Sequence, residues 1–121
     1  MNNSSLAAND LSFLVGKTLE QVCIGSFQTL LNFANNSTIE VACGLEIVVD
    51  GQIAKVGESY TSRIGIELVA FLGKVVSRAE KSERMVCVIF EDQTCARLLL
   101  KNDGYESINV SGGPHGNLTF Y

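Results

Sequence analysis

The sequence predicts a small, mainly β domain of the α+β class, in which two duplicated β-meander units pack as a sandwich or open barrel. The apolar segments of the 121-residue chain have strand length and are separated by turn-forming residues. The order of these segments repeats at a spacing of 57 residues. The length fits one domain. We therefore expect a single domain over 1–121, with repeat units at about 9–53 and 61–110 and a flexible arm at 1–8.

The repeat is clearest where each unit begins. The segment from Leu11 to Lys17 is similar to the segment from Leu68 to Lys74, and Phe90 follows Phe33 at the same spacing of 57 residues. One unit has too little apolar material for a stable core of its own. We therefore expect the two units to pack against each other about a pseudo-twofold axis.

The first unit opens with a short helical turn, for which Asn9 or Asp10 is the expected N-cap and Gly16 the residue after its end. Alternating apolar residues and turn signals then predict strands over 18–24, 27–33, 38–43 and 45–49. The pair Asp50-Gly51 closes the last of these strands, because Asp-Gly is a strong signal for a tight turn.

The second unit has the one real helix that the sequence predicts. Thr61 or Ser62 is the expected N-cap, and apolar residues at helical spacing place the helix near 62–72, before Gly73. Strands are expected over 75–79, 84–90, 94–100 and 105–110, with a charged turn over 80–83 and a last short strand over 117–121. The Gly-rich run 111–116 is interpreted as a turn, since it lacks the lysine and the strand-to-helix context of a phosphate loop.

No catalytic constellation can be assembled from this sequence, and we expect the protein not to be an enzyme. His115 is the only histidine and lies in the Gly-rich turn, away from any candidate nucleophile. The neighbouring acids Glu91 and Asp92 lie in a turn and do not converge as paired catalytic carboxylates would. The four cysteines, Cys23, Cys43, Cys87 and Cys95, lack the short spacing of a zinc site. No metal and no cofactor are expected.

The cysteines and the chain start suggest a location. Three cysteines lie in apolar surroundings, where a free thiol behaves as a small buried hydrophobe, as in a reducing cytoplasm. The first ten residues carry no basic, apolar signal peptide, and no apolar run is long enough to span a membrane. We expect a cytoplasmic protein that does not bind membranes.

The charge is uneven along the chain. The net charge is −4, and all of it comes from the first half, where six acids face two lysines. Nucleic-acid binding is not expected, because it depends on basic groups that neutralise phosphates. An acidic surface would instead attract a basic partner. If the strands around Gly44 pair with each other, Glu40, Glu46, Asp50 and Glu58 would line one exposed face; alternatively, they are scattered solubilising charges.

The order of motifs resembles a family of small bacterial domains that are similar to immunity proteins of polymorphic and contact-dependent growth inhibition toxins. The similarity rests on Phe71-Leu72-Gly73-Lys74, Phe90-Glu91-Asp92 and Tyr105-Glu106-Ser107-Ile108. It implies a protein that neutralises a cognate toxin domain, such as a basic nuclease, by covering its active site with acidic and aromatic side chains. The expected contact residues are Glu40, Glu46, Asp50, Glu58 and Tyr60, with Tyr105 and Glu106 as a second patch. Tyr105 and Glu106 have a rival interpretation, as a hydrogen-bonded pair that closes a strand.

Two other functions stay open. A small-ligand binder would hold a signalling nucleotide at the seam of the two units or across a homodimer, with phosphate-binding cations drawn from Lys17, Lys74, Arg78 and Arg97. A structural or assembly subunit is the third alternative. The sequence favours a protein partner, because the repeated units share a scaffold but differ in charge.

Overall fold

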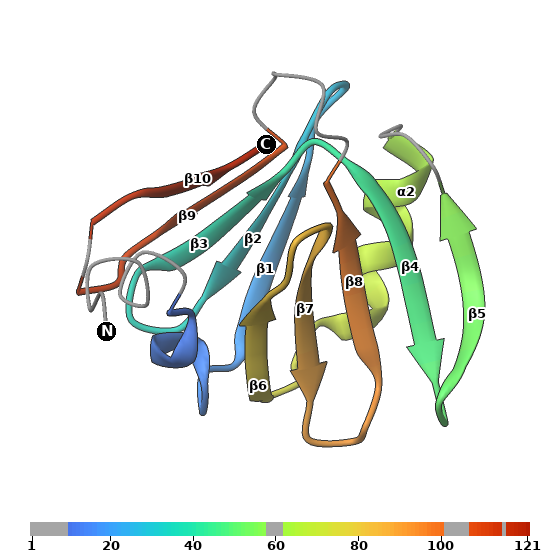
Figure 1. Ribbon diagram of the computed structural model, residues 1–121, viewed down its shortest axis with the longest axis horizontal. Helices are drawn as coiled ribbons and strands as arrows, with labels where there is room; N and C mark the ends of the chain where they lie inside the picture. The colour runs from blue at the N-terminus through green and yellow to red at the C-terminus, as the bar shows by residue number, and fades with distance from the viewer. Residues whose placement is uncertain (1–9, 58–61, 101–106, 115) are drawn as a thin grey trace.

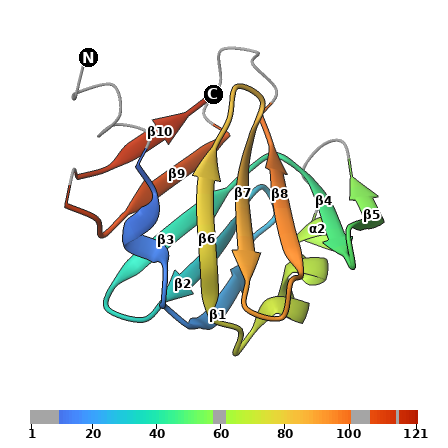
Figure 2. The same ribbon diagram turned by 60° about the horizontal axis from the view of Figure 1, so that its bottom comes forward.

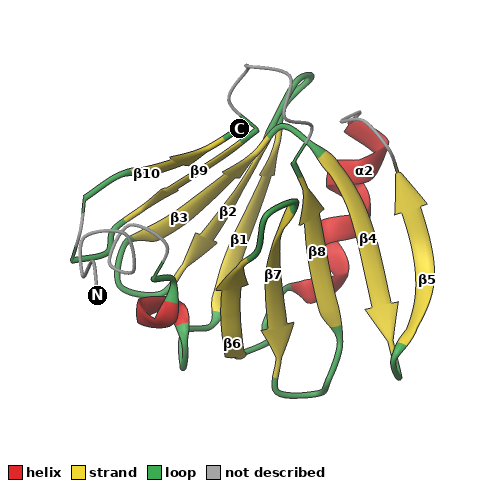
Figure 3. Ribbon diagram, viewed as in Figure 1, coloured by secondary structure: helices red, strands yellow, loops and turns green. Residues whose placement is uncertain are grey.

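The computed structural model describes residues 10–57, 62–100, 107–114 and 116–121. Over these residues the chain forms ten strands in two antiparallel five-stranded sheets, with one short α-helix (Figures 1 and 3). The sheets face each other in an open arrangement, so the predicted mainly β class is confirmed. No helix within the described ranges is long and apolar enough to cross a membrane.

The elements follow the chain in this order: η1 (Ser12–Leu14), β1 (Leu19–Ile24), β2 (Thr29–Phe33), β3 (Ser37–Val41), β4 (Gly44–Val49), β5 (Gln52–Gly57), α2 (Ser62–Leu68), η2 (Val69–Phe71), β6 (Val76–Lys81), β7 (Met85–Phe90), β8 (Cys95–Leu99), β9 (Ile108–Ser111) and β10 (Leu118–Phe120). Here η denotes a 3₁₀ turn. The helix lies where the sequence predicts it. The N-cap of the first turn is Leu11 and not the expected Asp10, although the Asp10 carboxylate accepts a hydrogen bond of 2.9 Å from the N–H of Ser12.

The two sheets exchange hairpins. The first sheet has the order β1-β2-β3-β9-β10 and the second has the order β5-β4-β8-β7-β6. Each sheet therefore joins a three-strand meander from one half of the chain to a hairpin from the other half. Residues 42–43 lie between β3, in one sheet, and β4, in the other. The strands on either side of Gly44 do not pair with each other, so this condition for a shared acidic face is not met.

The same hydrogen bonds recur 57 residues apart at the seam between the sheets. Residues Thr18 and Val75 form an isolated antiparallel bridge. Two matching hydrogen bonds of 2.8 Å flank it, one from Gly16 N–H to the Val76 carbonyl and one from Gly73 N–H to the Leu19 carbonyl. Gly16 and Gly73 both have positive φ, at 85° and 82°, which a residue with a side chain rarely adopts. The backbone ladder is therefore continuous across the seam.

Side chains on the inner faces of both sheets form one core. Alternate residues of β2, β3 and β7 are buried, as a strand with one covered face requires. Phe71, from η2, stacks on Phe90 with ring centroids 4.9 Å apart. The helix α2 packs against β1 and buries Leu68, and Figure 1 shows it behind β8 and β4.

The strand ends differ from the sequence prediction at several places, as where β2 begins at Thr29 and β3 ends at Val41, and two differences lie in the second sheet. The strand β5 was not expected; it is an edge strand with nearly all its residues exposed, so it lacks the alternation that marks a half-buried strand. The strand β6 continues to Lys81, so Glu80 and Lys81 belong to a strand and not to the charged turn that the sequence predicts. Figure 2 shows β6, β7 and β8 running side by side to the hairpin that joins β6 and β7.

Candidate functional site

The outer face of the second sheet carries an open groove with a volume of about 660 Å³. It is lined by side chains of four strands and of the turns at their ends, namely Val48, Asp50, Gly51, Glu80, Cys87, Ile89, Gln93, Cys95 and Arg97. These strand residues alternate in sequence with core residues such as Ile47, Val88 and Ala96, so they point away from the core.

Strand pairing places charged and sulfur side chains in one row across the groove. Glu46 on β4 pairs with Arg97 on β8, Arg97 pairs with Cys87 on β7, and Cys87 pairs with Glu80 on β6. A neighbouring row contains Val48, Cys95 and Ile89 and gives the groove an apolar part. The groove therefore combines apolar side chains with charges of both signs.

Both arginines on this face have acidic neighbours. Arg97 Nη1 lies 3.4 Å from Glu46 Oε1, and Arg78 forms an ion pair with Glu80 on the same strand. Asp50, at the β4–β5 turn, has no ion-pair partner among the described residues. Within the described part of the chain, Asp50 is therefore the groove acid that forms no ion pair.

The two groove thiols have different acidities. A hydrogen bond with Cys95, helped by the charge of Arg97, lowers the pKa of Cys87 to about 7, against the opposing effects of burial, Glu80 and Glu46. The same hydrogen bond, together with burial, raises the pKa of Cys95 above its ordinary value. Cys87 is therefore the more acidic of the two thiols.

A strip of exposed apolar side chains extends the groove face onto β5. Val56 pairs with Glu46, and Ile53 pairs with Val48, so both lie on the face that carries the groove. Their side chains are highly exposed, at 61% for Val56 and 51% for Ile53. Exposed apolar residues beside charged ones are typical of surfaces that bind other proteins.

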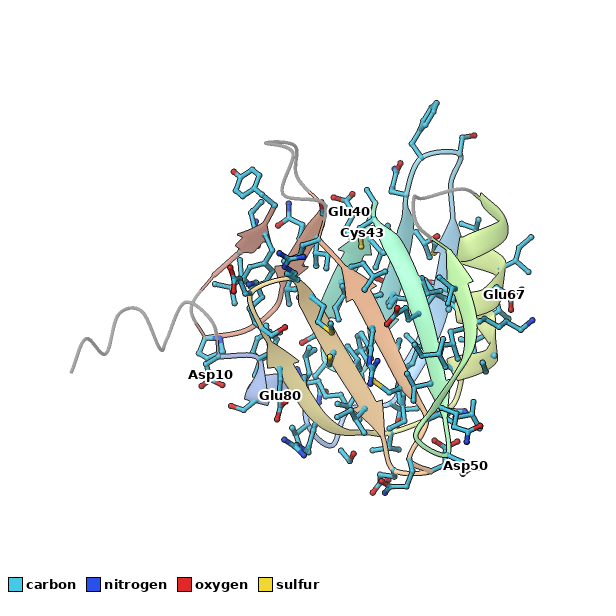
Figure 4. All side chains as sticks on the ribbon, turned by 45° about the vertical axis from the view of Figure 1, so that its right-hand side comes forward. Asp10, Glu40, Cys43, Asp50, Glu67 and Glu80 are labelled. Carbon is cyan, nitrogen blue, oxygen red and sulfur yellow. The ribbon has the colours of Figure 1, made fainter. Side chains whose placement is uncertain are left out.

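The structure separates the acids that the sequence analysis grouped together. Glu46 lies beside the groove and Asp50 lines it, whereas Glu40 lies on β3 and pairs with Asn109 on the other sheet. Figure 4 shows Glu40, Asp50 and Glu80 well apart on different elements. Four other candidates, Glu58, Tyr60, Tyr105 and Glu106, lie outside the described residues.

The cations considered for phosphate binding already have partners. Lys17 donates to the Ser37 hydroxyl, and Lys74 lies 2.7 Å from the Asp92 carboxylate. Both lysines lie at the seam, where the backbone ladder is continuous. Arg78 and Arg97 are paired with acids as described above.

Sequence reasoning did not identify Glu80, Cys87, Cys95 and Arg97 as one site. Arg97 and Glu46 are 51 residues apart in sequence, and only the pairing of β8 with β4 brings them together. The only local signal came from alternation. Cys87 and Arg97 occupy positions whose side chains point away from the core, in strands whose other residues are apolar.

Comparisons with protein-family models, curated proteins and solved structures found no match to this chain.

Proposed function

We propose that this protein is a cytoplasmic immunity protein that binds a basic bacterial toxin domain through the outer face of the sheet β5-β4-β8-β7-β6. The observation that supports this most strongly is the groove face itself. There, exposed apolar side chains of β5 adjoin a groove edged by Asp50 and Glu80. Interfaces between proteins commonly combine such an apolar centre with a charged rim.

The charge of the protein supports a basic partner. The net charge is −4, and acidic patches accelerate the encounter with basic proteins at low salt. Asp50 has a special role in this proposal, because it forms no ion pair with any residue that the structure describes and can meet a cation of the partner directly. Glu46 would first have to leave Arg97.

We expect reversal of the Asp50 charge to weaken the toxin complex. Asp50→Lys should lower the association rate about tenfold at low salt and much less at high salt, since screening weakens interactions between exposed charges. The measurement is surface plasmon resonance against the C-terminal domain of a large protein encoded directly upstream. Glu40→Lys is the matched control, because Glu40 lies on the other sheet. Equal effects of both variants would contradict the assignment of this face.

The apolar strip gives a second test of the same face. Ile53→Lys should slow growth rescue in cells that produce the toxin domain and should raise Kd by at least tenfold, because it places a charge at the apolar centre. Stability should change little, since the Ile53 side chain is already exposed.

Phe27→Lys is the control, because Phe27 is 81% exposed at the β1–β2 turn. If Phe27→Lys alone abolishes rescue, the partner binds elsewhere. If the wild type neither binds nor rescues, the immunity proposal is wrong.

The groove volume favours one second candidate, a small-ligand binder. A volume of 660 Å³ lies within the range of about 300–1,000 Å³ that is typical of small-molecule sites. Arg97 would be the cation that meets an anionic group there, after leaving Glu46. Mass spectrometry of a heat-denatured preparation tests this candidate: a stoichiometric nucleotide released from the wild type but not from Arg97→Gln would favour it.

A further inference from the structure

Two thiols from neighbouring strands, Cys87 and Cys95, line the same groove. Cys87 pairs across β7 and β8 with Arg97, and Cys95 lies two residues before Arg97 on the same face. Cys87 is partly exposed, and both cysteines line the groove. The register of β7 and β8 makes Cys87 and Cys95 diagonal neighbours on this face, so their side chains enter the same part of the groove.

The shared scaffold does not require sulfur at these positions. The residues 57 positions earlier, on β2 and β3 of the other sheet, are Leu30 and Thr38. Neither forms part of the core, and the same strand pairing is built with them. The thiol pair is therefore a feature of the groove and not of the fold.

Cys87 has the three properties that distinguish oxidant-sensitive cysteines from inert ones. It is accessible from the groove, it pairs with the cation Arg97 on β8, and a second thiol lies diagonally across from it on the same face. A thiol with a pKa of about 7 is roughly half ionised at neutral pH, whereas an ordinary cysteine is only a few per cent thiolate there. Sensor cysteines combine low pKa, exposure and a nearby resolving thiol.

We propose that Cys87 is a site of reversible oxidation by hydroperoxides and that Cys95 is its resolving thiol. The Cys87 thiolate attacks the peroxide oxygen; the O–O bond breaks, an S–OH bond forms, and hydroxide or alkoxide leaves. The Cys95 sulfur then attacks the Cys87 sulfur, an S–S bond forms, and the hydroxyl group leaves as water with the Cys95 proton. The peroxide is reduced by two electrons, and the two thiols are oxidised by two electrons.

The separation of the two cysteines favours reduction of the disulfide back to two thiols. Diagonal neighbours on antiparallel strands have Cα atoms about 7–8 Å apart, whereas disulfides usually join Cα atoms about 4.4–6.8 Å apart. The disulfide therefore forms with a local adjustment of β7 and β8, and strained disulfides are the more easily reduced ones. A dithiol reductant of the thioredoxin class, or glutathione, returns both thiols by exchange.

The test uses purified full-length protein without any partner, so its outcome is independent of the proposed toxin binding. After a stoichiometric amount of hydrogen peroxide, the intact mass should fall by two hydrogens, and peptide mapping should join Cys87 to Cys95. Cys95→Ser should instead accumulate a sulfenic acid that dimedone traps at Cys87. Cys87→Ser should show neither product.

Cys23→Ser is the matched control and should react like the wild type. Cys23 is a partly exposed thiol on the first sheet, where Asn32 Nδ2 donates to it at 3.7 Å. Oxidation of Cys23 as fast as Cys87, or an unchanged reaction in Cys87→Ser, would overturn the proposal.

A pH profile on the unmodified chain gives a readout that does not depend on how the serine variants fold. The titratable groups that face Cys87 are the charged Arg97 and the neutral Cys95 thiol from β8, Glu46 from β4 and Glu80 from β6. Alkylation of Cys87 by iodoacetamide should have its midpoint near pH 7. In Cys95→Ala the midpoint should move up toward about 8.5, the ordinary value. A wild-type midpoint at the ordinary value would overturn the proposal.

Discussion

The β7–β8 turn is held by a small network around one carboxylate. Lys74 Nζ lies 2.7 Å from Asp92 Oδ2, and the N–H of Thr94 donates to Asp92 Oδ1 at 3.0 Å. The hydrogen bonds from Lys74 and Thr94 lower the pKa of the Asp92 carboxyl to about 2. Asp92 is therefore better stabilised as a carboxylate in the folded protein than in the unfolded chain.

We expect Asp92→Asn to lower the free energy of unfolding at pH 7 by about 0.5–1 kcal/mol, since a half-exposed ion pair contributes modestly. The sign of the pH dependence follows from the lowered pKa. The stabilisation that the Asp92 carboxylate gives to the folded protein is present above the unfolded-state pKa of about 3.9 and is lost as pH falls toward 2. Urea denaturation at pH 7, 4 and 2.5 measures it. Glu91→Gln is the control, because Glu91 has no ion-pair partner among the described residues. If Asp92→Asn loses as much stability on acidification as the wild type, the network does not contribute.

Among the elements, the 3₁₀ turns show how the two halves fill the same place differently. Phe71, from η2, stacks on Phe90 in the second half. The residues 57 positions earlier are Leu14, from η1, and Phe33, and both are buried. A leucine therefore occupies, in the first half, the place that a phenylalanine has in the second.

This difference predicts the result of two substitutions. Phe71→Leu copies the pair of the first half and should cost less than about 1.5 kcal/mol, because hydrophobic replacements of similar volume are tolerated best. Phe71→Ala should cost about 3–5 kcal/mol, because it leaves a cavity against Phe90. Guanidinium denaturation measures both variants. If Phe71→Leu and Phe71→Ala lower the free energy of unfolding equally, the site cannot repack around a leucine, and the two halves differ in their packing.

The elements also show which features the sequence could predict. Strand positions followed from alternation and turn residues, and Gly16 and Gly73 followed from their place after a helical turn. The partners of the strands did not follow, since Gly44 was expected to be a turn between paired strands, whereas the chain there passes from one sheet to the other. The strand β5 was missed because it is exposed on both faces. Of the residues lining the groove, the sequence analysis named Asp50 as an acidic contact and Arg97 as a phosphate-binding cation, but it did not place them together, because that depends on pairing between distant strands.

At the scale of the whole molecule, the exchanged hairpins make each sheet depend on both halves of the chain. The strand β3 pairs with β9, and β4 pairs with β8, so the central ladder of each sheet crosses from one half to the other. The Ala42 N–H also donates to the Ser107 carbonyl at 2.8 Å. An acidic first half therefore does not form an acidic side of the molecule: Glu40 lies on one sheet, and Glu46 and Asp50 belong to the other.

This arrangement predicts that neither half folds alone and that the two halves fold together. Separately purified fragments 1–60 and 61–121 should each lack a cooperative thermal transition, because each would expose the edge and the core face that the other half covers. Mixing the fragments should restore β-type circular dichroism and give a one-to-one complex in size-exclusion chromatography.

Leu98→Asp in the second fragment is the control that should prevent reassembly, because Leu98 is fully buried and pairs with Leu45 from the first half. A cooperative transition in either fragment alone would mean that the sheets do not need the exchanged hairpins. The loss of reassembly in Leu98→Asp would identify the β4–β8 ladder as the contact through which the halves stabilise each other.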